Sequence, residues 1–184
     1  MPLPTPAARQ SLHHRELQCR GYRRDDGLWD IEGRMTDRKD YAFDSTYRGR
    51  LEPGTPVHDM WVRLTLDDQL VVREIAVASD DHPFPNCDAI EPAYDCIVGT
   101  RLAPGWTRIV RERLGGVAGC THLTRLLQEL SVVAMQTIMP VRSRETPGSE
   151  ERAVKPPHLD GCHALATDGP LVRELYPRWY RGKG

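Results

Sequence analysis

The stretch RERLGGVAGCTHLTRLLQEL, residues 111–130, places Cys120 and His122 behind three glycines at the expected start of a helix. The first turn of a helix carries unpaired N–H groups and a partial positive charge, and both stabilise a thiolate. Cys120 could therefore act as a nucleophile or metal ligand, with His122 as base or second ligand. Free cysteine also behaves as a small buried hydrophobe, so an ordinary turn is the plainer interpretation.

Further cysteine and histidine residues could join this pair if the fold brings them together. Cys87 lies in a polar, proline-broken segment, His58 stands near the start of a predicted strand, and Cys162 precedes His163 in DGCHAL. Thiolates and imidazoles together suit zinc, iron or an iron–sulphur cluster. The candidate metal ligands are Cys87, Cys120, His122 and Cys162, and the candidate catalytic residues are Cys120, His122 and His58.

Two arginines and a tryptophan are candidate substrate contacts. Arg111 and Arg113 precede the proposed helix start, where their guanidinium groups could bind an anionic substrate. Trp61 lies on the polar side of a predicted strand, where it could contact a substrate or a second copy of the chain. The plainer alternatives are a solvated helix face for the arginines and, for His58, a half-buried histidine bonded to a backbone carbonyl.

The composition excludes some classes of protein. With 25 basic and 26 acidic residues the net charge is −1, which argues against a nucleic-acid binder. The mean hydropathy of −0.54 is typical of a soluble protein, and no stretch approaches the ~20 apolar residues of a membrane helix. The first residues lack the apolar region of a secretory signal, so we expect a cytoplasmic protein. Five cysteines without a CxxC pair are expected to be free thiols, catalytic residues or metal ligands.

The elements that would position these residues begin with strands. Residues 17–43 hold two alternating runs around the turn sequence RRDDG, and Trp29, Ile31 and Met35 share one parity. Residues 56–79 alternate on both sides of an acidic turn, which predicts a β-hairpin. His58 shares the parity of the apolar residues in this hairpin, so we expect it to face the core.

Helical spacing follows in three stretches, residues 89–99, 103–116 and 120–139. In the last of these a single apolar stripe contains Leu123, Leu127, Leu130, Ala134 and Ile138. Thr121 is the predicted N-cap of this helix, and Pro140 is predicted to end it.

Strands followed by helices predict an α+β fold, with an N-terminal antiparallel sheet and C-terminal helices on one of its faces. Residues 1–14 are expected to be a flexible arm and residues 15–140 a single α+β domain. Residues 141–157 are expected to form a charged linker, and residues 158–184 a segment that packs back on the domain.

Three segments, HDMWVRLT, VRERLGGVAGCTHLTRLL and LDGCHAL, resemble a bacterial family of unknown function over roughly Arg20 to Trp179. The Gly-Cys-Thr-His-Leu motif is the most specific part of this resemblance. The resemblance implies no settled activity, but an association of some members with aromatic-compound catabolism implies an aromatic substrate.

The layout is also similar to that of the iron–sulphur cluster scaffold proteins, in which a loop cysteine and a helix-opening cysteine bind the cluster. This similarity implies ligands at Cys87 and Cys120, with Cys96 in the place of the middle cysteine. The chain departs from that family, because Gly119 replaces the histidine before the last cysteine and PNCDAI replaces Cys-Gly-x-Ala. We therefore use the similarity for architecture and not for activity.

Three functions stay open at this point. The first is a small enzyme, lyase-like or using thiol- or metal-assisted acid–base chemistry on a small organic substrate, aromatic compounds included. The second is a non-catalytic module that binds a metal or an iron–sulphur cluster. The third is a structural or interaction protein whose cysteines only fill the core, and a homo-oligomer is compatible with all three.

Overall fold

The computed structural model describes residues 3–145, 155–156 and 158–182 of the chain. It divides the chain into two compact units, residues 1–141 and residues 142–184. The second unit contains the short helices η4 (His163–Leu165), α3 (Pro170–Leu175) and η5 (Pro177–Trp179). The predicted packing of residues 158–184 on the domain stays a prediction. The predicted linker, residues 141–157, lies largely outside the described residues, and its first part belongs to a helix.

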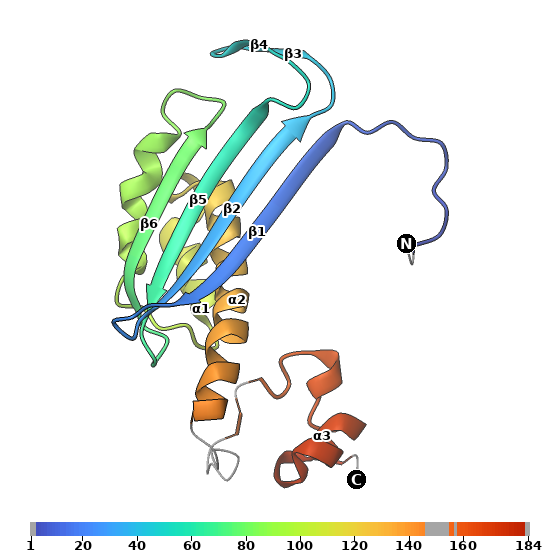
Figure 1. Cartoon of the computed structure of the whole chain (residues 1–184), viewed down its shortest axis with the longest axis vertical. Coiled ribbons are helices and arrows are strands. Elements are labelled where there is room, and N and C mark those ends of the chain that lie inside the picture. Colours follow the sequence, from blue (N-terminus) through green and yellow to red (C-terminus); the bar gives the residue numbers. More distant parts are fainter. Residues whose placement is uncertain (1–2, 146–154, 157, 183–184) are drawn as a thin grey trace. The chain divides into compact units, whose positions relative to one another are not determined.

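The first unit is built on an antiparallel sheet with the strand order β1-β2-β5-β6 (Figure 1). Its strands are β1 (His13–Arg23), β2 (Trp29–Lys39), β5 (Pro56–Leu66) and β6 (Val72–Asp81). Strands β3 (Phe43–Ser45) and β4 (Gly49–Leu51) form a separate two-stranded hairpin between β2 and β5. Strand β1 begins at His13, inside the segment predicted to be a flexible arm.

Helices follow the sheet in the sequence and cover one of its faces (Figure 1). They are the 3₁₀ helices η1 (Asp88–Ile97) and η2 (Gly116–Ala118), and the α-helices α1 (Trp106–Leu114) and α2 (Thr121–Glu145). The predicted α+β class, with a sheet and then helices, is confirmed. In the described part of the chain, no helix is both long enough and apolar enough to cross a membrane.

Two predictions about the ends of α2 are wrong. The helix continues beyond Pro140 to Glu145, because a proline removes one backbone donor while the residues after it can resume helical bonding. Thr121 is the first helical residue and not the N-cap. Cys120 has that position, and its carbonyl oxygen accepts the N–H of Thr124 at 2.9 Å.

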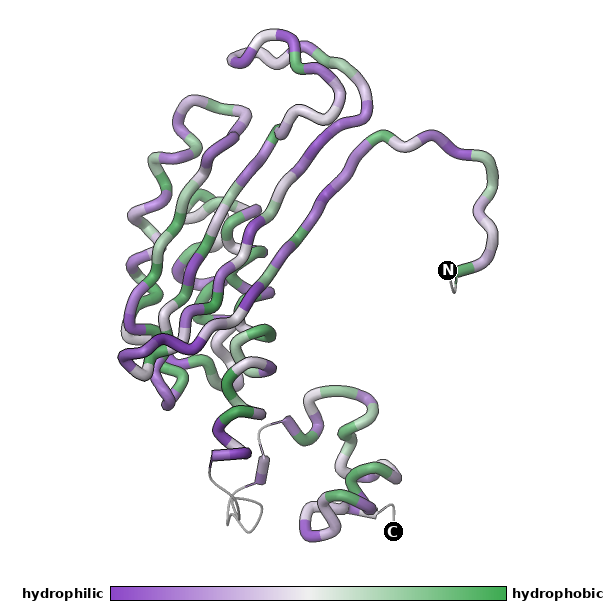
Figure 2. Tube along the Cα trace, in the orientation of Figure 1, coloured by the Kyte–Doolittle hydropathy of each residue, from purple (hydrophilic) through white to green (hydrophobic). Residues whose placement is uncertain are grey.

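The core lies between the sheet and the helices. Hydrophobic and hydrophilic residues alternate along β2 and β5 (Figure 2), so each of these two strands presents one apolar side. On β2 the buried row contains Trp29, Ile31 and Met35, and the paired row on β5 contains Met60 and Val62. The apolar stripe of α2 is buried too, at Leu123, Leu126, Leu127, Leu130, Ala134 and Ile138.

Two glycines let α2 approach the sheet closely. A Cβ atom on Gly33 of β2 would lie 2.8 Å from Leu126 Cδ1 and 2.8 Å from Leu130 Cδ2. A Cβ atom on Gly21 of β1 would lie 2.1 Å from Oγ1 of Thr137. The helix therefore crosses from β2 to β1 along its length. This path places its first turn over the C-terminal end of β2 and the N-terminal end of β5.

We expect Gly21→Ala to destabilise the chain by roughly 1–3 kcal/mol, because the new methyl group overpacks a closed contact. Urea unfolding of the full chain measures this loss. Removing the clashing γ atoms with Thr137→Ala in the same chain should restore part of it. A Gly21→Ala variant as stable as the wild type would contradict the close packing of α2 on β1.

Candidate functional site

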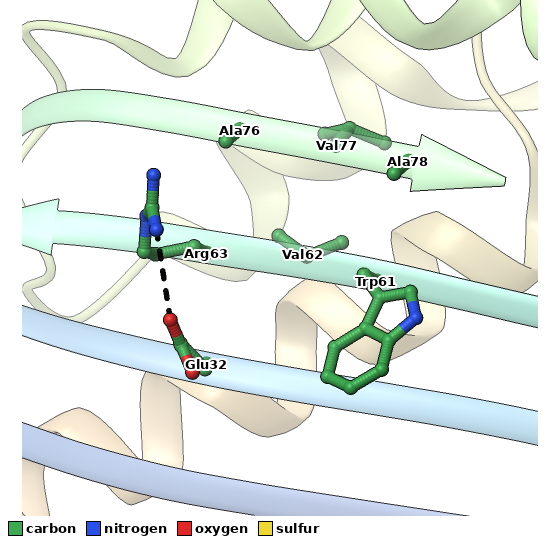
Figure 3. A pocket seen from close by; sticks show the side chains of 7 residues that line it. All are labelled: Glu32, Trp61, Val62, Arg63, Ala76, Val77 and Ala78. Atoms are coloured by element: carbon green, nitrogen blue, oxygen red, sulfur yellow. Dashed lines mark ion pairs between the residues drawn. The ribbon is translucent and has the colours of Figure 1, made fainter. Parts of the chain in front are cut away.

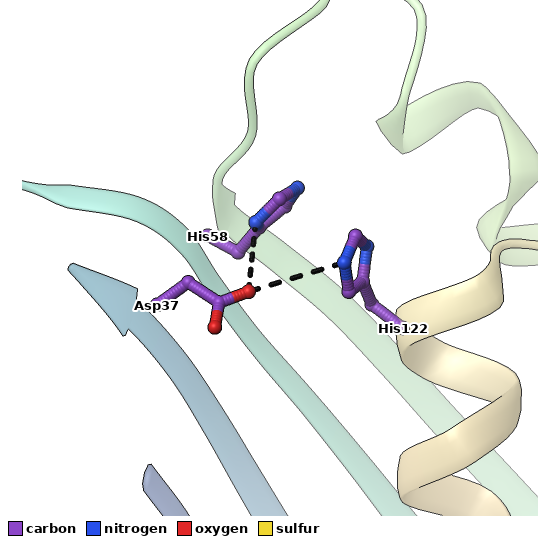
Figure 4. Close-up of side chains that lie close together, drawn as sticks. All are labelled: Asp37, His58 and His122. Atoms are coloured by element: carbon purple, nitrogen blue, oxygen red, sulfur yellow. Dashed lines mark hydrogen bonds and ion pairs between the residues drawn. The ribbon is translucent and has the colours of Figure 1, made fainter. Parts of the chain in front are cut away.

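Asp37, His58 and His122 meet at one end of the sheet, below the first turn of α2 (Figure 4). Each offers one ligand atom, and these atoms all lie within 4.8 Å of one another. Among the residues that the structure describes, this is the only group of three or more His, Cys, Asp or Glu side chains that meets this criterion. We call these three residues the Asp–His–His cluster.

The strand pattern explains how the cluster forms. Asp37 continues the inward-facing row of β2 after Gly33 and Met35, so a carboxylate follows apolar residues on the core side. Asp37 is paired directly with His58 of β5, and the register then shifts, which leaves Val57 unpaired. His122 comes from the second residue of α2, and the close packing of that helix brings its ring to the strand pair.

Asp37 is a buried carboxylate that forms an ion pair with an arginine side chain. Its side chain is only 2% exposed, and Arg15 of β1 donates from Nε to Oδ1 at 2.7 Å and from Nη2 to Oδ2 at 2.6 Å. His13 Nε2 also lies 3.1 Å from Oδ1. Burial by itself raises the pKa of Asp37, but the hydrogen bonds and charge of Arg15 outweigh it and hold the pKa below its usual value. The carboxylate is therefore ionised at neutral pH.

The bond to Asp37 decides the tautomer of His58. Nδ1 of His58 lies 3.0 Å from Oδ2 of Asp37, and an ionised carboxylate can only accept. Nδ1 therefore carries the proton, and Nε2 keeps its lone pair. Burial, and then the repulsion that His122 exerts when it is protonated, lower the pKa of His58 to about 4, against the attraction of Asp37. The ring is neutral at physiological pH.

His122 is a second neutral imidazole beside the first. The two ring centroids lie 4.0 Å apart, with the planes inclined at 40°. Nε2 of His122 lies 3.9 Å from Oδ2 of Asp37, and Nδ1 lies 3.9 Å from Sγ of Cys120. Burial, and then the charge of Arg15, lower the pKa of His122. The cluster thus combines one fixed negative charge with two uncharged rings.

Tyr94 of η1 positions the start of α2. Its hydroxyl group accepts the backbone N–H of Cys120 at 3.1 Å and lies 2.9 Å from Oγ1 of Thr124. The Tyr94 side chain is fully buried, so this contact ties η1 to the first turn of α2. The Cys120 N–H is therefore bonded, and the Cys120 thiol and the His122 ring come from the turn that Tyr94 positions.

The structure brings His122 close to both His58 and Cys120, and the other two predicted ligands belong to other elements of the chain. Cys87 precedes η1, and Cys162 belongs to the unit of residues 142–184. Neither they nor Cys120 belong to a group of three or more metal-type donors among the described residues. Their assignment as ligands, and with it the cluster sites that the scaffold proteins imply at Cys87 and Cys120, stays a prediction.

The three predicted substrate contacts are exposed or already hydrogen-bonded. Arg113 donates from Nη1 to the carbonyl oxygen of Cys96, and Arg111 is exposed on α1. Trp61 lies on the outer sheet face, opposite in parity to His58, and its indole N–H donates to Asp80 at 3.1 Å. There Trp61 borders a shallow groove of about 220 Å³ beside Ala78 (Figure 3). These three roles stay predictions.

The sequence interpretation missed Asp37, Arg15 and Tyr94. Asp37 shares the parity of Trp29 and Met35, so extending that alternation would have found an inward carboxylate. Nothing local marks Arg15, because its role depends on the register that pairs it with Asp37. Tyr94 gives no signal either, because its hydroxyl reaches a residue 26 positions away.

Comparison with known proteins gives the family. Residues 13–136 match the family model described as a protein of unknown function (DUF2889). The chain belongs to this family. The matched span begins with β1 and ends inside α2, so it contains the whole Asp–His–His cluster and leaves out the segment around Cys162. No curated protein and no solved structure matches the chain.

The lowered pKa of His58 predicts a loss of stability in acid. Because the pKa is about 4 in the folded chain and ~6.5 in the unfolded chain, only the unfolded chain binds this proton between those values. Stability should therefore fall as the pH decreases from about 6.5 to about 4, by up to ~3 kcal/mol for this group. Urea unfolding at several pH values measures the slope, which His58→Gln should flatten.

His82→Gln serves as the control for this experiment, since His82 lies in a loop outside the cluster. It should leave the slope unchanged. Equal slopes for the wild type and His58→Gln would contradict the buried, neutral state of the His58 ring.

Proposed function

We propose that this chain is a small enzyme that moves protons on a small organic substrate, in a lyase-like reaction. The observation that carries the proposal is the 3.0 Å contact between His58 Nδ1 and Asp37, which leaves Nε2 of a neutral ring free to accept a proton. The second imidazole stands at a centroid distance of 4.0 Å, within reach of the same substrate. Aromatic compounds are the substrates to try first, because the resemblance noted in the sequence implies them.

The roles follow from the contacts. Arg15 holds the Asp37 carboxylate through two hydrogen bonds, and Asp37 orients the ring of His58. His58 Nε2 accepts a proton from the substrate as general base. The cation that forms is repelled by Arg15, and burial disfavours it, so His58 readily returns the proton to the product. A base that also acts as the acid suits an elimination or its reverse.

Cys120 and His122 supply a second reactive pair in the same site. The thiol lies 3.9 Å from Nδ1 of His122, and Cys120 occupies the N-cap of α2. A nucleophilic role for Cys120 would make His122 its base. Variants of Cys120 and His58 therefore separate covalent catalysis from simple proton transfer.

Incorporation of solvent deuterium tests the proposal without a known substrate. Purified protein is incubated in D₂O with a panel of small hydroxy, keto and aromatic acids, and exchange at acidic C–H bonds is followed by NMR. We expect exchange in the wild type, a loss of 10²-fold or more in His58→Gln, and a smaller loss in Asp37→Asn. Cys120→Ser should keep the exchange if the thiol is not the nucleophile. No exchange with any compound, or exchange equal in His58→Gln, would count against the enzyme.

A divalent metal ion is the second candidate, and the donor set favours it. Two imidazoles and one carboxylate are the ligands of many zinc and non-haem iron sites. Both rings are neutral at physiological pH, as metal ligands must be, and Arg15 would orient the carboxylate from outside. Bound there, the metal would supply Lewis-acid chemistry to the substrate. An iron–sulphur cluster suits this group less, since it contains no thiolate.

Metal analysis of protein purified without chelators or affinity metal tests this second candidate. If the Asp–His–His cluster is a metal site, the wild type should hold close to one zinc or iron per chain. His58→Gln and His122→Gln should lose it, because two remaining donors bind weakly. Cys87→Ser and Cys162→Ser are matched controls that should retain the metal. A wild type without metal would remove this candidate and leave the acid–base enzyme.

A further inference from the structure

Strand β1 leaves one edge of the sheet without a partner in the described part of the chain. It pairs with β2 over its whole length, from His13 to Arg23, and with no other strand of the described residues. At the opposite edge, the start of β6 is bonded to the loop that contains Gly99 and Thr100. All residues of β1 except Cys19 are exposed, among them Leu17 and Tyr22, which are 43% and 42% exposed. Such an edge is a template for pairing with another strand.

The backbone groups of this edge alternate in a known phase. Leu12 accepts from the N–H of Asp40, and Arg24 donates to the carbonyl of Leu28, so the even-numbered residues point their N–H and C=O groups at β2. The register between β1 and β2 has no shift. The odd-numbered residues therefore direct their backbone groups to the open edge. An incoming strand would bond to these residues.

We propose that the occupant is a second copy of the same strand, paired antiparallel about a two-fold axis at Gln18. In this register Glu16 lies opposite Arg20 of the second copy, and Arg20 lies opposite its Glu16. All eleven residues of β1 are then paired, and every side chain keeps its face of the sheet. Opposite charges placed directly across two strands stabilise the pairing.

Other registers are less complementary. A shift by two residues places Glu16 opposite either Gln18 or Tyr22 of the second copy, so the ion pairs are lost. A shift by four residues places Glu16 opposite Glu16, or Arg20 opposite Arg20, which is repulsive. The charge pattern of β1 thus favours the register with the longest overlap, and the result is one continuous eight-stranded sheet with both helical layers on the same side.

The pairing also affects the candidate site. Arg15, which holds Asp37, would lie opposite Gly21 of the second copy. Gly21 is the residue on which Thr137 of α2 packs. The α2 helix of the second copy would therefore run beside Arg15 and cover the side of the Asp–His–His cluster that faces the open edge. This inference does not depend on the proposed enzyme activity.

Sedimentation of the full chain gives the first test, with an expected mass of twice 20.9 kDa. Charge reversal then tests the register. Arg20→Glu and Glu16→Arg each create two like-charge pairs in a homodimer and should weaken dimerisation by roughly tenfold or more. The double variant Glu16→Arg/Arg20→Glu should restore it. An equimolar mixture of the two single variants should form a heterodimer, because every pair is then complementary.

A cross-link tests the two-fold axis. In the proposed dimer, Gln18 of one copy lies opposite Gln18 of the other, at a pair without backbone hydrogen bonds. The Cα atoms of such a pair lie about 4.5 Å apart, close enough for a disulfide. Gln18→Cys should therefore oxidise to a covalent dimer. Tyr22→Cys is the matched control on the same strand face, since it lies opposite His14 and should not cross-link. Circular dichroism and urea unfolding check that each variant folds.

Three results would overturn the proposal. A wild type that stays a monomer at all concentrations is the first, and protection of the odd-numbered β1 amides in that monomer would assign the edge to the chain's own residues 142–184. A dimer that both charge reversals leave unchanged is the second. A dimer in which Gln18→Cys fails to cross-link is the third. None of these results affects the acid–base or metal experiments, which read out His58 and His122.

Discussion

A carboxylate buried against an apolar sheet face is the constraint on which the candidate site depends. Asp37 is almost inaccessible to water, and an unpaired charge in that place would be strongly unfavourable. Arg15 on the neighbouring strand compensates it with two short hydrogen bonds. This pair leaves Asp37 ionised, and an ionised Asp37 determines which nitrogen of His58 carries the proton. The chemistry available to the site thus follows from one ion pair between β1 and β2.

The packing of α2 completes the arrangement. A helix kept at normal distance from the sheet would hold His122 away from Asp37, but Gly21 and Gly33 allow close contact. Tyr94 then fixes the first turn through the backbone of Cys120. Because both imidazoles are partly buried near a guanidinium group, the pKa of each is lowered, and neutral imidazoles can accept protons or bind a metal. The two proposed functions, proton transfer and metal binding, therefore rely on the same three side chains.

Strand β1 connects the site to the surface of the molecule. Its inward row supplies Arg15 to the buried carboxylate, while its outward row carries Glu16, Gln18 and Arg20 along an open edge. The residues of one strand thus serve the interior and the proposed interface at once. Since the family match begins at His13, the whole strand lies within the family domain.

The alternation and the helical periodicity of the sequence determined most of the fold. Period two over residues 56–79 predicted the β5–β6 hairpin and the inward direction of His58, because side-chain direction in a strand depends only on local parity. The stripe of α2 was predicted for the same local reason. The predicted end of α2 at Pro140 was wrong. A proline removes one hydrogen bond locally, whereas the length of a packed helix depends on the contacts around it.

Only the tertiary structure decided the site. The sequence pointed to the thiol and imidazole of Cys120 and His122, which are neighbours along the chain. The partners of His122 come from β2 and β5, and no local pattern states that Asp37 is paired with His58 or that Arg15 is paired with Asp37. Register between strands and the crossing path of a helix are set by the fit of whole surfaces. The sequence therefore identified the two histidines as candidates, and only the fold showed that both lie beside the carboxylate of Asp37.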